Sequence, residues 1–143
     1  DLGNAWQGEA REVAKTLVGN LLACDQAPIC MIAGGETTVT IQGLGKGGRN
    51  QELALAAVPL LAGVPNVILV TLATDGEDGP TNAAGAVVTG ETDMRAQALG
   101  LDSTEYLANN DAYHFFEQLG DLLKPGPTGT NVNDLTFLFR FNA

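Results

Sequence analysis

Positive charge is scarce in this chain, which has seven lysines and arginines against seventeen aspartates and glutamates and a net charge of −10. Nucleic acids and anionic membranes are bound by basic surfaces, so the composition argues against both as partners. Long apolar runs are also missing, because none reaches the roughly 18 to 20 residues of a membrane span, and residues 1–12 show no signal-peptide pattern. We expect a cytoplasmic protein without a nucleic-acid or membrane partner.

Cysteine and histidine are nearly absent as well. Cys24 and Cys30 have neither a CxxC spacing nor histidines nearby, which favours core thiols in a reducing compartment over a disulfide or a metal site. The only histidine, His114, stands beside Phe115 and Phe116 in a helical pattern, and no serine or cysteine pattern marks a partner nucleophile. The sequence therefore favours binding and positioning of a substrate over covalent catalysis.

The 143 residues have 45% hydrophobic content, enough for one globular domain with a core. Because the chain begins with Asp1 rather than methionine, we expect it to be a piece of a longer protein. The apolar spacing predicts a single α/β domain over 1–143, with a mixed β-sheet and flanking helices. The expected helices are 2–23, 50–61, 92–99, 103–107 and one after 111; the expected strands are 28–33 and 37–42 as a hairpin, 66–73 covered on both faces, 85–88 and 135–141.

A glycine-rich loop at 43–48 leads directly into the helix expected at 50–61. Glycines let backbone N–H groups approach a ligand, and the start of a helix leaves such groups unpaired, so Gly47 and Gly48 are candidates for holding a phosphate or carboxylate. Lys46 and Arg49 add full charges, and Arg49 has the fork geometry that suits such an anion. A plain structural turn is the alternative.

The same loop matches GxGxxG, which raises the possibility of a dinucleotide site. Two features weaken it. The strand before the loop alternates like a half-exposed strand, whereas a Rossmann strand is buried on both faces. The next acidic residue after a strand, Asp75, follows the first glycine by about 30 residues instead of roughly 20.

Three carboxylates follow the most apolar strand, in the loop Asp75-Gly76-Glu77-Asp78-Gly79. Mg²⁺ in phosphate sites typically takes one or two carboxylates, so Asp75 and Asp78 are candidate metal ligands; an acidic solvated turn is the alternative. Two polar loops add weaker candidates. Asn110 belongs to a run that would also serve as a helix cap, and Thr130 and Asn131 lie in a loop that could form an anion nest or only a turn.

Taken together, these motifs resemble the C-terminal MOFRL domain of glycerate 2-kinases over nearly the whole chain. The matching runs are Gly34-Gly35-Glu36-Thr37-Thr38-Val39-Thr40, Gly47-Gly48-Arg49-Asn50-Gln51-Glu52, Thr74-Asp75-Gly76, Asp78-Gly79-Pro80-Thr81, Asn109-Asn110-Asp111 and Gly126-Pro127-Thr128-Gly129-Thr130-Asn131-Val132-Asn133-Asp134-Leu135. Three positions depart from the usual pattern of that family, which has Ser at Ala33, Arg at Lys46 and Asp at Asn82.

The resemblance implies ATP- and Mg²⁺-dependent phosphorylation of D-glycerate at its 2-hydroxyl. It also implies a cleft between two α/β domains, of which the N-terminal, nucleotide-binding one is not in this sequence, so the 143 residues alone should not turn over. The residues expected to face the cleft are Glu36, Arg49, Asn50, Asp75, Asn110 and Asn131. A stand-alone module that binds a small anion, and a hydroxypyruvate reductase, are the other functions considered.

Overall fold

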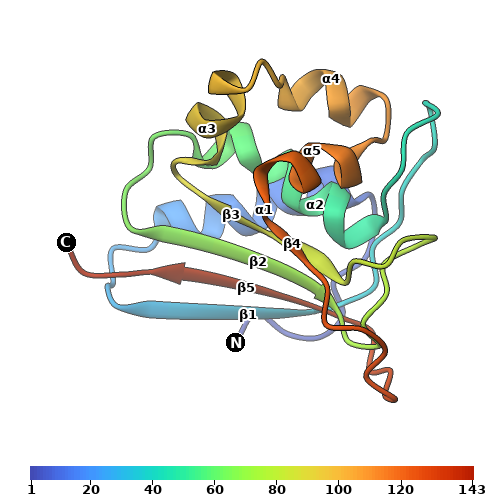
Figure 1. The fold of residues 1–143 in the computed structure, drawn as a ribbon. Helices are drawn as coiled ribbons and strands as arrows, with labels where there is room; N and C mark the ends of the chain where they lie inside the picture. The colour runs from blue at the N-terminus through green and yellow to red at the C-terminus, as the bar shows by residue number, and fades with distance from the viewer.

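The computed structural model describes residues 1–143 and places all five helices on one side of a five-stranded sheet (Figure 1). In chain order the elements are α1 (Ala10–Ala23), β1 (Ile29–Gly35), α2 (Arg49–Leu61), β2 (Val67–Ala73), β3 (Gly85–Thr89), α3 (Thr92–Ala98), α4 (Ser103–Ala108), α5 (Ala112–Leu119), β4 (Leu122–Leu123) and β5 (Asp134–Arg140). None of the helices combines the length and the apolar character needed to cross a membrane.

The sheet has the strand order β1-β5-β2-β3-β4, so the last long strand of the chain is inserted between β1 and β2. The α/β fold class in a single domain is thereby confirmed. Each pair of neighbouring strands is antiparallel, whereas the sequence led us to expect a mixed sheet. The reason is the insertion: β1 and β2 point the same way, but β5 separates them and runs opposite to both.

The hairpin expected from 28–33 and 37–42 is wrong. β1 pairs with β5 instead, and the chain after Gly35 leaves the sheet. A Cβ at Gly35 would overlap the Trp6 carbonyl, so the N-terminal segment lies where a hairpin partner would have to pass. Residues 37–42 stay extended along that segment: Thr38 N–H donates to the Gly8 carbonyl, and the Thr38 carbonyl accepts from Ala10 N–H, both at 2.8 Å.

The N-terminal helix begins at Ala10, eight residues later than its apolar pattern predicted. Residues 1–9 run extended beside β1, where Leu2 N–H donates to the Ile32 carbonyl and Trp6 N–H to the Gly34 carbonyl. Gly3 and Gly8 have φ angles of 89° and 106°, which a helix does not accommodate. The apolar residues at 2, 5 and 6 thus have helical spacing in a segment whose backbone N–H groups donate to carbonyls of β1.

The hydrophobic core lies between the helices and one face of the sheet, and its largest fully buried side chains include Phe115, Phe116 and Leu138. The other predicted helices agree with the structure to within one or two residues. Strand 66–73 was expected to be covered on both faces, and this is wrong: side chains of β2 alternate between buried and half-buried, because no helix covers the second face.

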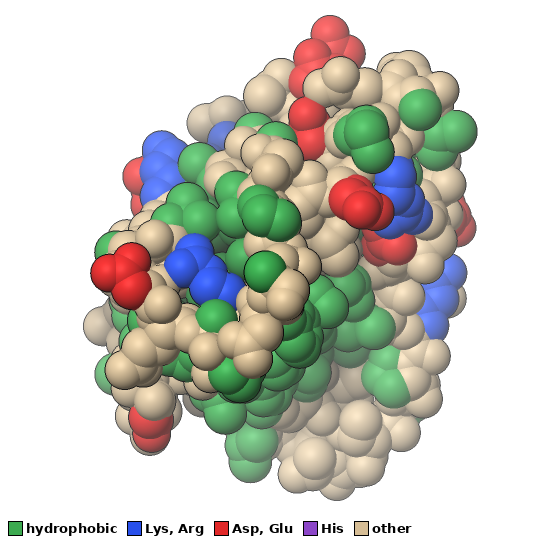
Figure 2. Space-filling view, turned by 90° about the vertical axis from the view of Figure 1, so that its left-hand side faces the viewer, with side chains coloured by type: hydrophobic (Ala, Val, Ile, Leu, Met, Phe, Trp, Pro, Cys, Tyr) green, Lys and Arg blue, Asp and Glu red, His purple; other side chains and the backbone are tan.

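That second face is nevertheless apolar. Phe137, Phe139 and Phe141 stack along it with ring centroids 6.4 and 6.0 Å apart, so their side chains share one face. Ile32 beside them is 41% exposed and Phe141 is 46% exposed. Figure 2 looks at the end of the molecule where the C-terminus lies, and hydrophobic side chains gather across its middle and lower parts, while the charged groups are scattered around them.

The opposite end of the sheet brings distant loops together. Gly35 at the end of β1 pairs with Asp134 at the start of β5, and Ala73 at the end of β2 pairs with Asp134 from the other side. Because β1 and β2 end where β5 begins, the segments after β1 and β2 and the loop before β5 all emerge at this edge. The start of α2, at Arg49, lies above it.

Candidate functional site

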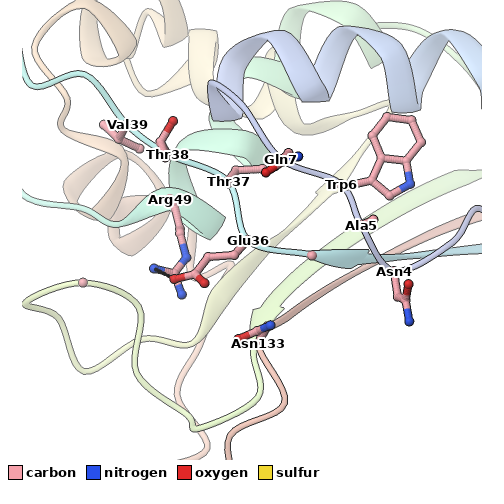
Figure 3. A pocket seen from close by; sticks show the side chains of 12 residues that line it. Asn4, Ala5, Trp6, Gln7, Glu36, Thr37, Thr38, Val39, Arg49 and Asn133 are labelled. Carbon is pink, nitrogen blue, oxygen red and sulfur yellow. Dashed lines mark ion pairs between the residues drawn. The ribbon is translucent and has the colours of Figure 1, made fainter.

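A hollow of about 710 Å³ opens at this edge of the sheet. Its lining consists of the N-terminal segment Asn4–Gln7, the segment Gly35–Val39 at and after the end of β1, Arg49 at the start of α2, and Gly79 and Asn133 (Figure 3). Arg49 is the only cation among the lining residues. We call this space the Arg49 hollow.

Two carboxylates hold the guanidinium of Arg49. Asp134 Oδ2 lies 2.5 Å from Nε and Asp134 Oδ1 3.2 Å from Nη2, a side-on pair of hydrogen bonds. Glu36 Oε1 lies 3.2 Å from Nη1. The Asp134 side chain is 10% exposed, whereas that of Glu36 is 57% exposed. Asp134 is therefore a buried anchor, and Glu36 a solvent-facing partner that meets Arg49 inside the hollow (Figure 3).

The electrostatics keep Arg49 charged. The hydrogen bond with Asp134 raises the pKa of the Arg49 guanidinium, and the charges of Asp134, Glu36 and Asp78 act in the same direction against the effect of burial. One guanidinium between Asp134 and Glu36 leaves a local excess of negative charge. An external anion can therefore form a full ion pair with Arg49 only if one of these carboxylates moves away from the guanidinium.

The predicted metal ligand Asp78 is buried and caps the start of α2. Its Oδ1 accepts the backbone and side-chain N–H groups of Asn50, both at 3.1 Å, and its Oδ2 accepts those of Gln51, at 2.9 and 3.1 Å. Burial raises the pKa of the Asp78 carboxyl, although these four hydrogen bonds work in the opposite direction. Asn50, expected to face the cleft, is 2% exposed and spends its side chain on the same cap.

These contacts make a poor fit for Mg²⁺ at Asp78, because both carboxylate oxygens already accept N–H groups. Asp75 lies apart: its Oδ1 accepts Glu77 N–H at 3.1 Å within its own turn, and it does not line the Arg49 hollow. The structure also contains no group of three or more carboxylate, histidine or cysteine side chains arranged to hold a metal. We therefore assign no residue of this chain as a Mg²⁺ ligand.

Asn110 organises the glycine-rich loop from below. Its Oδ1 accepts the N–H groups of Gln42 and Gly43 at 2.6 and 2.9 Å, and its Nδ2 donates to Glu52 Oε1 at 2.7 Å and to the Thr40 carbonyl at 3.3 Å. All the hydrogen-bonding capacity of this 6%-exposed amide is thus used inside the protein. Asn110 supports the loop and does not point into the Arg49 hollow.

The neighbours of Asn110 continue this pattern along the loop. Asn109 Oδ1 accepts Leu44 N–H at 3.1 Å, and Asp111 Oδ1 accepts Lys46 N–H at 2.9 Å. A Cβ added at Gly43 or Gly45 would overlap Asn109 or Asp111. Most N–H groups of the loop are therefore consumed, and these glycines permit close packing between two segments. Only the N–H groups of Gly47, Gly48 and Arg49 have no protein partner.

This arrangement predicts that Asn110→Gly lowers the free energy of unfolding by about 2 kcal/mol, because several buried hydrogen-bonding groups lose their partner. Glycine is chosen because Asn110 has φ 54°, so the substitution removes the side chain without straining the backbone. Urea unfolding gives the value. Asn109→Ala, which removes one exposed hydrogen bond, is the matched control and should cost less than about 1 kcal/mol. Equal losses for both would refute the anchoring role.

The remaining predicted residues do not line the hollow. Lys46 turns toward Tyr113, with its Nζ 4.0 Å from the ring centroid. Thr130 and Asn131 are exposed in the loop before β5, where Asn131 Oδ1 accepts Asn133 N–H at 3.0 Å. Of the predicted set, Arg49 and Glu36 are the two that line the hollow.

Asp134 is the principal residue that sequence reasoning missed. It lies 85 positions from Arg49, and only the insertion of β5 beside β1 brings the two together. Asn133 and the Asn4–Gln7 segment were missed too, the latter because it read as helix. The signal that could have found Asp134 is a carboxylate at the first position of a strand rich in Leu and Phe, where a buried charge needs a partner.

Comparison with known proteins places this geometry in a family. A D-glycerate 2-kinase of Thermotoga maritima is 55% identical over 108 residues, covering 76% of this chain and 26% of the relative. An Agrobacterium vitis protein, a hydroxypyruvate reductase by name, is 38% identical over 142 residues, covering 94% of this chain and 32% of the relative. The crystal structure of glycerate kinase from Thermotoga maritima superposes with a TM-score of 0.93 at 43% identity, covering 97% of this chain and 35% of that one.

The chain thus spans about a quarter to a third of the length of these relatives. Residues 29–134 match the MOFRL family, and this range contains Glu36, the glycine-rich loop, Arg49 and Asp134. The protein belongs to the MOFRL family, whose matched relatives include glycerate kinases.

Proposed function

We propose that this chain is the C-terminal part of a glycerate 2-kinase that transfers a phosphoryl group from ATP to the 2-hydroxyl of D-glycerate. In the complete enzyme it forms one wall of a cleft against an N-terminal domain. The observation that carries the proposal is Arg49, a cation held by Asp134 that lines a hollow of about 710 Å³ in a chain similar to glycerate kinases.

Arg49 suits this role because D-glycerate carries a carboxylate and the transferred group is a phosphate. A guanidinium binds either anion through parallel N–H groups, and Asp134 fixes its plane before the ligand arrives. Mg²⁺ enters with ATP and supplies charge neutralisation. This half supplies the orientation of the substrate.

A nicotinamide-dependent reductase fits the loop less well. A dinucleotide fingerprint leaves its backbone N–H groups free for the pyrophosphate, but here the side chains of Asn109, Asn110 and Asp111 accept most of them. Addition of NADH should therefore produce no difference absorbance with the 143-residue protein.

A graft tests the kinase directly. The C-terminal segment of the Thermotoga maritima glycerate kinase that superposes on this chain is replaced by residues 1–143, and ADP release is measured with ATP and D-glycerate in a coupled assay. We expect glycerate-dependent turnover from this grafted kinase and none from the 143 residues alone. A grafted protein that melts cooperatively like its parent yet shows no turnover would contradict the proposal, as would turnover by the isolated chain.

Glu36 occupies the place on Arg49 that a substrate anion would take. Of the two carboxylates on the guanidinium, it is the one with a single contact and a largely exposed side chain, so it is the one that can withdraw. In the proposed enzyme Glu36 therefore competes with the substrate carboxylate until the substrate binds.

Glu36→Gln should accordingly lower the KM for D-glycerate in the grafted kinase by about two- to fivefold, because a surface ion pair is worth roughly 1 kcal/mol or less. The KM for ATP serves as an internal reference and should stay within about twofold. Glu12→Gln, which removes an exposed carboxylate paired with Lys15 on α1, is the matched control. An increase in the KM for D-glycerate would show that Glu36 assists the substrate and does not compete with it.

A further inference from the structure

Lys46 and Lys124 stand out among the seven cations of this acidic chain. Arg11, Lys15, Arg49 and Arg95 each form an ion pair with a carboxylate, and Arg140 donates to the Cys24 carbonyl. The ammonium groups of Lys46 and Lys124 have neither a carboxylate nor a hydrogen-bond acceptor.

Both ammonium groups lie against the same aromatic ring. Nζ of Lys46 is 4.0 Å and Nζ of Lys124 is 5.2 Å from the centroid of Tyr113. The ring is well fixed, because Tyr113 is 5% exposed, its hydroxyl donates to Asn82 Oδ1 at 2.8 Å, and its backbone N–H donates to the Lys46 carbonyl at 2.9 Å. A cation–π contact orients each lysine but does not neutralise its charge, so both charges remain available to an anionic ligand.

The surroundings of this pair suit a phosphorylated ligand. On one side, Gly47 directly follows Lys46 and has an N–H group without a protein partner. On the other, Lys124 lines a hollow of about 470 Å³ whose walls include Leu72, Ala84 and Leu123. A phosphoryl group bound at these lysines would neutralise their charge, and the apolar hollow beside Lys124 could receive a less polar part of the same molecule.

We propose that Lys46, Tyr113 and Lys124 form a second anion site, separate from the Arg49 hollow, that binds a phosphoryl group. A role of this site in catalysis rests on the proposed function, because a glycerate kinase binds a nucleoside polyphosphate in addition to its carboxylate substrate. The shared chemistry is phosphate, and its source is either inorganic phosphate or a nucleoside diphosphate.

Isothermal titration calorimetry on the 143-residue protein tests the site, with inorganic phosphate and ADP as separate probes. We expect at least one of them to bind, and Lys46→Gln and Lys124→Gln each to weaken that binding by about three- to tenfold, since each removes a charge-assisted contact. Lys15→Gln, which removes an equal charge on α1, is the matched control and should leave the affinity unchanged. Binding should also weaken at higher ionic strength.

The two anions separate the possible ligands. Tighter binding of ADP than of phosphate indicates that the apolar hollow is used, and equal binding indicates a phosphate site alone. The proposal is overturned if neither anion binds, or if Lys15→Gln weakens binding as much as the other two substitutions do. The loss caused by Lys46→Gln and Lys124→Gln distinguishes this site from the Arg49 hollow, where both variants retain the two carboxylate partners of Arg49. Failure of the site would therefore not bear on the Arg49 hollow, and loss of turnover in the grafted kinase would not bear on the lysines.

Discussion

Arg49→Ala should lower kcat/KM for D-glycerate in the grafted kinase by at least about a hundredfold, because a preorganised cation at a reacting anion is among the largest single contributions to catalysis. The physical basis is the side-on pair with Asp134, which fixes the guanidinium in the hollow before substrate arrives. Arg49→Lys keeps the charge but loses the fork, and should recover only part of the activity. Initial-rate kinetics over both substrates provide the measurement.

The control must separate catalysis from folding. Removing Arg49 leaves Asp134 buried without its partner, which should cost about 1–3 kcal/mol of stability. The double variant Arg49→Ala/Asp134→Ala removes this unpaired carboxylate, so its free energy of unfolding should return toward that of the unsubstituted protein. Its activity should not return. Wild-type kinetics in the stable double variant would remove Arg49 from the site.

Asp78→Asn should lower the free energy of unfolding of the 143-residue protein by about 2–4 kcal/mol, although it only replaces one carboxylate oxygen with an NH₂ group. The carboxylate accepts four N–H groups from Asn50 and Gln51, and an amide has only one oxygen to offer them. Its NH₂ group would face donors and leave them unpaired at the start of α2. Asp75→Asn in the same loop is the matched control, and should change stability by no more than about 0.5 kcal/mol.

The pH dependence of stability provides a second readout for Asp78. Because burial raises the pKa of its carboxyl, the folded protein holds this proton at pH values where the unfolded chain has already released it. The contribution of Asp78 to stability therefore falls as pH rises from the ordinary carboxyl pKa through the raised one. Asp78→Asn should remove this decline from the unfolding profile. Identical profiles for the two proteins would contradict the assignment.

Much of the fold could be predicted from the sequence wherever local pattern and tertiary contacts agree. The second helix and the strand at 66–73 have long apolar runs with clear ends, and both are found within a residue of their expected bounds. The pattern failed at 2–9 and 37–42. The backbones of these two segments hydrogen-bond to each other, and the first segment also hydrogen-bonds to β1. Periodicity reports which side chains are buried, but it does not report which backbone a segment pairs with.

The candidate site could be predicted only in part for a related reason. Arg49 and Glu36 carry charges in glycine-rich loops, where a ligand role is a natural inference. A prediction of Asp134 would have required the strand order, and a prediction that Asp78 is buried would have required its contact with α2. The glycines at 43 and 45 also illustrate the limit, because a close approach to a ligand and a close approach to Asn109 and Asp111 impose the same requirement on the sequence.

In the proposed enzyme Arg49, held by Asp134, binds the carboxylate substrate. This binding can be measured by calorimetric titration of D-glycerate into the grafted kinase without nucleotide, with the Arg49→Ala/Asp134→Ala variant alongside. We expect binding by the unsubstituted protein and affinity at least about tenfold weaker in the variant, the loss expected for a charge-assisted pair. Equal affinity in two equally stable proteins would contradict it.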